Sequence, residues 1–207
     1  MDDNASGYRA LLSPGTGEAD IDTCVPSTTL VAMMLRWMLV FEERDVDTVW
    51  LLKAAPRRFY PGSNDRRAAA DDDENSFLVV RQAATRFGWV SFSVDKQTDD
   101  KGTTVPVASI EGSSLQIEAN VSLVLHGRGF VGTGDCLRVV VRLRDPAGER
   151  SLKSASITGS IGGRVTIAEV DSAGESVAVE VPRAVAAQAP AGGTSTVVSF
   201  SIVAQLQ

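Results

Sequence analysis

The pattern of apolar and polar residues divides the chain into a helical part and a longer β part. From Leu30 to Phe41, apolar residues recur at the three- and four-residue spacing of one helical face. Most other positions of that segment are apolar too, and Arg36 is its one charged residue. A helix that is apolar nearly all round is normally buried on every side. We therefore expect one long apolar helix, starting at the capping pair Ser27 and Thr28, that needs other helices to cover it.

After Asp45 the pattern becomes alternating, which predicts strands as far as the end of the chain. In residues 115–125 every second residue is apolar, so one face of this strand is expected in the core and the other in water. The same alternation recurs in residues 137–143 and 198–206. Shorter strands are predicted at residues 48–52, 77–81, 89–94, 152–157, 165–170 and 176–181. Roughly nine strands with turn-rich connections favour a β-sandwich.

The expected fold class is therefore mainly β, with an antiparallel β-sandwich preceded by one long apolar α-helix. Residues 1–45 would hold a polar lead-in and the helix, and residues 46–207 would form the β-sandwich domain. Three stretches are rich in small, polar or alanine residues and are interpreted as surface-loop insertions: 62–75, 95–106 and 183–193.

Composition and charge narrow the classes of function. The chain has 207 residues, of which 43% are hydrophobic, and this excludes a wholly disordered protein. Its 20 Lys and Arg against 26 Asp and Glu give a net charge of −6, which argues against nucleic acid and anionic membrane surfaces as partners. The apolar run 30–41 is shorter than the about 20 residues that span a bilayer. The first residues, 1–4, lack the basic start of a signal peptide, and the compartment stays unknown.

Histidine and cysteine are too scarce for the usual metal and nucleophile sites. Cys24 and Cys136 lie far apart with no second ligand at metal-binding spacing, and His126, the one histidine, lies in a glycine-rich turn. We therefore expect no metal, no cofactor and no histidine-based catalytic triad.

Several short segments, taken in order along the chain, carry a family resemblance. They are Val25-Pro26-Ser27, residues 32–39, Val49-Trp50-Leu51-Leu52, Pro56-Arg57-Arg58-Phe59, Pro61-Gly62, Ala84-Thr85-Arg86-Phe87-Gly88, Val90-Ser91, residues 141–146 and residues 154–159. Together they resemble the C-terminal part of bacterial-type glycosidase-like proteins of the six-hairpin, or (α/α)6-barrel, superfamily. In that family a last barrel helix is followed by a β-sandwich that packs on the barrel.

The resemblance implies that the predicted helix is the last helix of a helical barrel that this chain lacks. The chain would then be a non-catalytic, structural accessory segment of a carbohydrate-active protein. Its partner would be a helical barrel domain or subunit that packs on these side chains: Leu30, Met33, Met34, Trp37, Met38 and Phe41. Two other functions stay open, a stand-alone carbohydrate-binding module and a glycosidase.

Each of these alternatives has its own candidate residues. A glycosidase needs an acid and a second carboxylate, and the candidates nearest the barrel side are Glu18, Asp20 and Asp22, in a polar stretch typical of a solvated linker. Trp89 lies on the polar side of its predicted strand, where it can stack on a sugar or pack against the helix or a neighbouring domain. Arg86 can assist such a ligand or form a structural ion pair.

Overall fold

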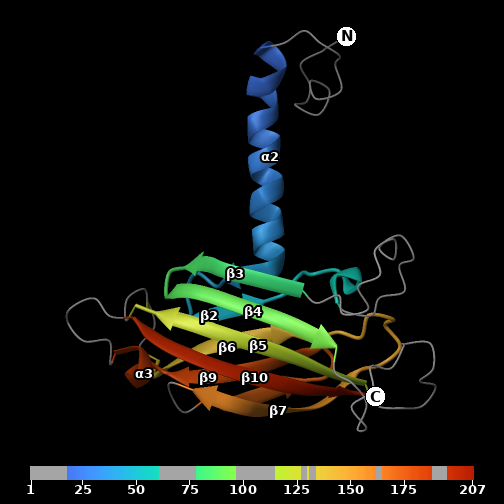
Figure 1. Ribbon diagram of the computed structural model, residues 1–207, viewed down its shortest axis with the longest axis vertical. Helices are drawn as coiled ribbons and strands as arrows, with labels where there is room; N and C mark the ends of the chain where they lie inside the picture. Colours follow the sequence, from blue (N-terminus) through green and yellow to red (C-terminus); the bar gives the residue numbers. More distant parts are fainter. Residues whose placement is uncertain are drawn as a thin grey trace.

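The computed structural model describes residues 18–60, 78–96, 115–126, 130, 134–161, 165–187 and 195–207, and this part of the chain is mainly β (Figure 1). Its strands are β1 (Val40–Glu42), β2 (Thr48–Leu51), β3 (Leu78–Thr85), β4 (Gly88–Lys96), β5 (Leu115–Leu125), β6 (Cys136–Arg142), β7 (Leu152–Ile161), β8 (Thr166–Asp171), β9 (Ser176–Pro182) and β10 (Thr196–Leu206). Its helical segments are α2 (Glu18–Leu39), the 3-10 turn η1 (Arg57–Phe59) and α3 (Arg183–Ala187).

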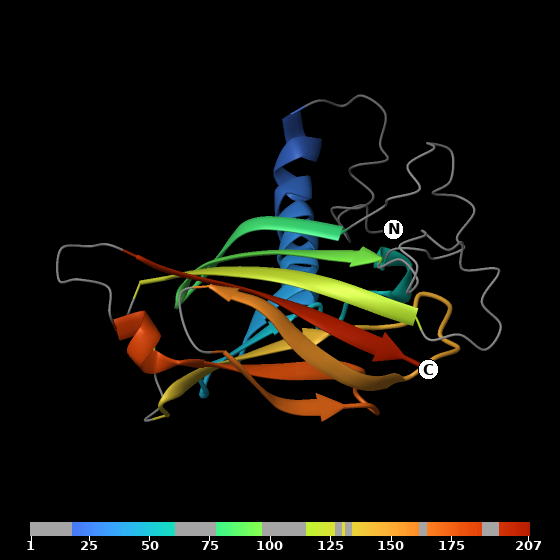
Figure 2. The ribbon, with the colours of Figure 1, turned by 60° about the horizontal axis from the view of Figure 1, so that its bottom comes forward.

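The strands form two five-stranded sheets that lie face to face in a sandwich-like arrangement (Figure 2). One sheet has the order β1-β2-β6-β9-β8 and the other the order β3-β4-β5-β10-β7. Within the described residues, neighbouring strands pair antiparallel with one exception, since β2 runs parallel to β6, with Thr48 beside Arg138 and Leu51 beside Val141. The first sheet is therefore mixed, whereas the sequence predicted antiparallel pairing.

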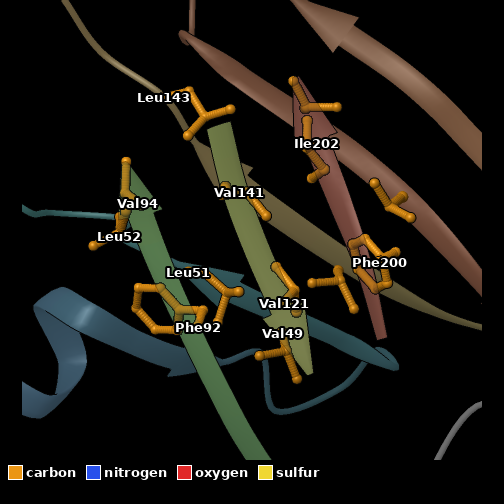
Figure 3. Packing of buried hydrophobic residues seen from close by; sticks show 14 of the residues in the cluster. Val49, Leu51, Leu52, Phe92, Val94, Val121, Val141, Leu143, Phe200 and Ile202 are labelled. Atoms are coloured by element: carbon orange, nitrogen blue, oxygen red, sulfur yellow. The ribbon is translucent and has the colours of Figure 1, made fainter. Parts of the chain in front are cut away.

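A single apolar core fills the space between the sheets. Along β5 the residues alternate strictly between buried and half-buried, as their sequence pattern predicts. Figure 3 shows Phe92, Val121 and Phe200 of one sheet turned toward Val49 and Val141 of the other. Because both sheets contribute to one cluster, each sheet buries its apolar inner face against the other.

The predicted strands are found, with shifted ends. β3 continues to Thr85, four residues beyond its predicted end, and β7 continues to Ile161. The predicted loop 95–106 is wrong at its start, since Asp95 and Lys96 belong to β4 and pair with β5; the remainder lies outside the described residues. The predicted loop 183–193 begins with the five-residue helix α3, and residues 62–75 also lie outside the described part.

The helix has different ends from those expected. α2 begins at Glu18 rather than at Ser27, so the chain is already helical where the capping pair was expected. It ends at Leu39 rather than at Phe41, because Val40 is buried in the core and pairs with β2. Backbone N–H groups of the segment after β2 donate to the last carbonyls of α2, from Leu52 to Leu39 at 2.8 Å and from Ala54 to Met38 at 3.3 Å. These bonds satisfy acceptors that a helix leaves open and join α2 to the sheet.

Candidate functional site

A group of large apolar side chains on α2 is left open to solvent. The exposed fractions of the following side chains lie between 43% and 56%: Leu30, Val31, Met33, Met34, Leu35 and Trp37. In Figures 1 and 2 this helix projects away from the two sheets. We call these six side chains the α2 surface. Large exposed apolar patches on a folded protein indicate a contact site.

The α2 surface is too wide for a single helix to cover. At 100° per residue, its six positions extend over about 200° of the helix circumference. A two-helix seam covers only a narrow stripe of a helix. The surface therefore suits a partner that touches α2 from more than one side.

Six residues were expected to face a helical partner, and two of them, Met38 and Phe41, are not exposed on α2 like the other four. Met38 is half-buried near the sheet end of α2. The prediction that Phe41 lies on the helix face is wrong, because Phe41 belongs to β1 and pairs with Trp50. The ammonium of Lys53 lies 4.3 Å from the centre of the Phe41 ring and 4.7 Å from the Trp50 ring, so the hairpin β1–β2 holds both rings.

The one charged residue of residues 29–39 turns back toward the sheets. The Arg36 guanidinium donates to Glu42 Oε1 at 3.1 Å and to the carbonyl of Ala84. The other carboxylate oxygen of Glu42 accepts the backbone N–H of Arg86 at 2.8 Å. This junction links α2, β1 and the turn between β3 and β4. It fixes the base of α2 and leaves the α2 surface without a charge.

Arg86, expected to assist a ligand or to form an ion pair, is engaged within the protein. Its guanidinium donates to the carbonyl of Arg44 at 2.8 Å and to that of Val46, and lies 3.6 Å from the carboxylate of Asp47. It also lies over the ring of Phe87, 4.6 Å from the ring centre. All four contacts are internal, and three of them hold the β1–β2 loop against the β3–β4 turn, so the geometry gives Arg86 a structural role.

Trp89 is 44% exposed on β4, on the polar side of the strand as the alternation predicts. The ladder places it opposite Val124 of β5, which in turn lies opposite Val197 of β10. These three residues form an apolar row on the outer face of the second sheet. The structure thus separates Trp89 from Arg86, whose side chain faces the β1–β2 loop.

The carboxylates expected for a glycosidase cannot be placed as a pair. Glu18, Asp20 and Asp22 lie on the first turns of α2, and their side chains fall outside the described residues. Asp145 is fully buried, and its carboxylate accepts the backbone N–H groups of Glu149 at 2.8 Å and of residue 150 at 3.0 Å. Its oxygens stabilise the turn formed by residues 145–150.

A charged cluster lies where β6 ends and β9 begins. Glu175 Oε1 lies 2.6 Å from an Arg57 nitrogen, and its Oε2 lies 2.9 Å from Arg144 Nε. Burial, with the positive charge of Arg144 next, lowers the pKa of Arg142. Burial also raises the pKa of Tyr60, whose hydroxyl donates to the Arg142 carbonyl at 2.7 Å. These bonds connect the segment after β2 to the ends of β6 and β9, so the cluster has a structural role.

A trough crosses the outer face of the second sheet, with a cavity volume of about 340 Å³. Residues of β3, β4, β5, β10 and β7 line it, so it runs across the strands rather than along them. The polar side chains among them are Arg81, Ser91, Ser93, Asn120, Ser122, Ser199 and Ser201. We call this feature the serine trough. The sequence analysis did not predict this trough. Its polar side chains occupy outward-facing positions of alternating strands, but the alternation does not determine the register that aligns them across strands.

The described residues contain no cluster of three or more His, Cys, Asp or Glu that could hold a metal ion. Within the same residues, no helix is both long and apolar enough to cross a bilayer. Burial raises the pKa of the Cys136 thiol, which keeps it in the weakly nucleophilic protonated form.

No protein-family model, curated protein or solved structure matches this chain.

Proposed function

We propose that this chain is a non-catalytic accessory segment of a glycoside-hydrolase-like, carbohydrate-active protein, and that it docks on a helical partner through α2. The observation that carries the docking is the α2 surface, with six large apolar side chains each about half exposed. The segment resemblance supports the class of the partner, because that family places a sandwich behind the last helix of a barrel.

The chemistry of the α2 surface is that of a contact region. Methionine and tryptophan are enriched at interfaces and charged residues are depleted there. The surface holds Met33, Met34 and Trp37, and the nearest charge, on Arg36, is engaged with Glu42 and the sheet. A partner that covers these six side chains therefore pays no cost for desolvating a charged group among them.

Covering the surface makes a favourable contribution to the free energy of association. Burying a large apolar side chain contributes about 1.5–3 kcal/mol when it starts fully exposed, so six half-exposed side chains offer roughly 5–9 kcal/mol before association costs. This amount is on the order of the net stability of many small domains. An isolated chain that exposes this surface to water is therefore expected to associate, for example with a second copy of itself.

The base of α2 supports docking as a fixed unit. Carbonyls of Met38 and Leu39 accept backbone N–H groups of the segment after β2, and Glu42 joins Arg36 to the β3–β4 turn. A helix held at its base loses little orientational freedom when its partner binds.

The test is the association state of the full chain, measured by size-exclusion chromatography with light scattering over a range of concentrations. We expect the native chain to associate and the double variant Leu30→Lys, Met34→Glu to be monomeric with unchanged thermal unfolding. Val197→Lys is the matched control, since Val197 is equally exposed but lies on β10, and this variant should associate as the native chain does. A native monomer whose α2 amides are protected from hydrogen exchange without any partner would contradict the proposal.

A further inference from the structure

We propose that the serine trough binds an oligosaccharide chain laid across the strands of the second sheet. The inference deepens the proposed function, on which it rests for the class of ligand, by placing the sugar-binding polar groups on residues other than Arg86, with Trp89 at the border of the site. Its shape, its hydrogen-bonding groups and its borders each contribute to the argument.

The shape of the trough follows from aligned small side chains. The ladders place Ser91, Ser122 and Ser199 in one row across three strands. The next row holds Ser93, Asn120 and Ser201. Gly159 of β7 extends the lining to the fifth strand. Neighbouring strands are about 4.8 Å apart, so a lining that crosses five strands is about 19 Å long. Its volume of about 340 Å³ lies in the range of small-ligand sites.

Hydrogen bonds within the floor fix the direction of its polar groups. Asn120 Nδ2 and the Ser93 hydroxyl both lie 3.2 Å from Asp95 Oδ2, which as a carboxylate only accepts. This contact orients the Asn120 amide, so that its oxygen faces the Ser201 hydroxyl and accepts from it. The floor is thus ordered before any ligand arrives, which lowers the entropy cost of binding.

The same network leaves donors for a ligand. Asn120 Nδ2 has two hydrogens, and one of them meets Asp95. The Ser122 hydroxyl accepts from Ser199 at 3.0 Å, and the Ser91 hydroxyl accepts from the backbone N–H of Gln82 at 3.0 Å. Each of these two hydroxyls keeps its own hydrogen to donate. Closely spaced donors and acceptors on small side chains match the hydroxyl groups of sugar rings.

A peptide strand is a poor occupant of this site. The strands β4, β5 and β10 of the floor are paired on both sides, so their backbone groups are already used in the ladders. A peptide strand binds a sheet through an open edge, in line with the strands. The trough instead runs across them, and recognition depends on side chains.

The borders of the trough also suit a sugar. Among the described lining residues Arg81 is the charged one, and its guanidinium can donate hydrogen bonds to the hydroxyl oxygens of a sugar. The apolar row of Trp89, Val124 and Val197 comes two residues before Ser91 along β4, about 7 Å away. Trp89 is exposed there and presents a flat apolar surface along one side of the trough.

The test is isothermal titration calorimetry of the full chain with four probes: cellohexaose, xylohexaose, maltohexaose and chitohexaose. We expect at least one probe to bind the native chain. Ser122→Leu, which fills the trough, and Asn120→Ala, which removes its directed amide, should each weaken that binding about tenfold or more. Ser156→Leu is the control, because Ser156 is exposed on β7 outside the trough, and it should bind as the native chain does.

Two results would overturn the proposal: none of the four probes binds, or Asn120→Ala binds as tightly as the native chain. Should Ser122→Leu fail to fold, as judged by thermal unfolding, Asn120→Ala decides alone. The monomeric α2 variant Leu30→Lys, Met34→Glu is titrated in parallel. Retained binding in that variant shows that the trough acts independently of docking, so failure of either proposal is recognised separately.

Discussion

Gly88 provides a direct test of how closely β4 and β5 pack at the start of their ladder. Its φ angle is +141°, a region that residues with a Cβ rarely adopt. A Cβ placed there would lie 1.9 Å from the carbonyl oxygen of Val124, whereas real Cβ contacts are essentially never shorter than 3.0 Å. The obstacle is backbone, so Gly88→Ala must push the two strands apart by more than 1 Å.

The cost follows from two contributions. The backbone conformation costs about 1–3 kcal/mol for a residue with a Cβ. Displacing β4 also weakens the pairing of Gly88 with Leu125 and the 3.0 Å bond from His126 N–H to the Phe87 carbonyl, at about 1 kcal/mol for each bond lost. We therefore expect Gly88→Ala to lower the free energy of unfolding by about 3–5 kcal/mol in all.

Urea unfolding followed by circular dichroism measures this loss. Gly159→Ala is the matched control, because Gly159 also has a positive φ, +63°, but a Cβ there meets nothing within 4 Å. That variant should lose only about 1–2 kcal/mol, the cost of the left-handed conformation. Equal losses in the two variants would refute the steric reasoning, and with it the close approach that sets the β4–β5 register beneath the serine trough.

Two further predictions concern the charged cluster where β6 ends and β9 begins. Burial raises the pKa of Tyr60 above its unfolded value of about 10, so the folded chain keeps a proton that the unfolded chain releases. Stability from this group is complete below pH 10 and falls as the pH rises above it. Tyr60→Phe should flatten that alkaline decline in thermal unfolding, and an identical decline in both proteins would contradict the assignment. Glu175→Gln removes the carboxylate shared by Arg57 and Arg144 and should cost about 2–3 kcal/mol in urea unfolding, below the loss for a fully buried pair because the Arg57 side chain is 38% exposed. A loss under about 0.5 kcal/mol, the range of ordinary surface changes, would show that the cluster is solvated.

The strands were predictable because local alternation is sufficient to define them. In β5 every second position from Leu115 to Leu125 is apolar and buried, since one face of an antiparallel strand in a sandwich must meet the core. The end of α2 was not predictable in the same way. Val40 and Phe41 continue the apolar helical pattern, but pairing with β2 replaces the helix there, and that pairing depends on residues ten positions further along.

The serine trough shows why a site on a sheet is harder to foresee than the sheet itself. Alternation identifies Ser91, Asn120 and Ser201 as outward-facing residues of three different strands. Only the register brings Asn120 beside both Ser93 and Ser201, and a shift by one residue would turn its side chain into the core. The parallel pairing of β2 with β6 is another long-range property, since residues 48–51 and 138–141 share no local signal.

The position of α2 gives the proposed docking a second physical basis. α2 leads directly into β1, and β1 is the outer strand of its sheet, paired with β2 on one side. An outer strand with an open edge can recruit other chains, and proteins usually keep such edges short or cover them. β1 has three residues, and the hydrogen bonds of Arg36 and Arg86 to Glu42 hold its end against the β3–β4 turn. A partner that surrounds the α2 surface would approach this edge as well. If α2 docks as proposed, one contact protects both the helix and the edge strand, so the monomeric α2 variant should leave β1 less protected from hydrogen exchange than it is in the associated native chain.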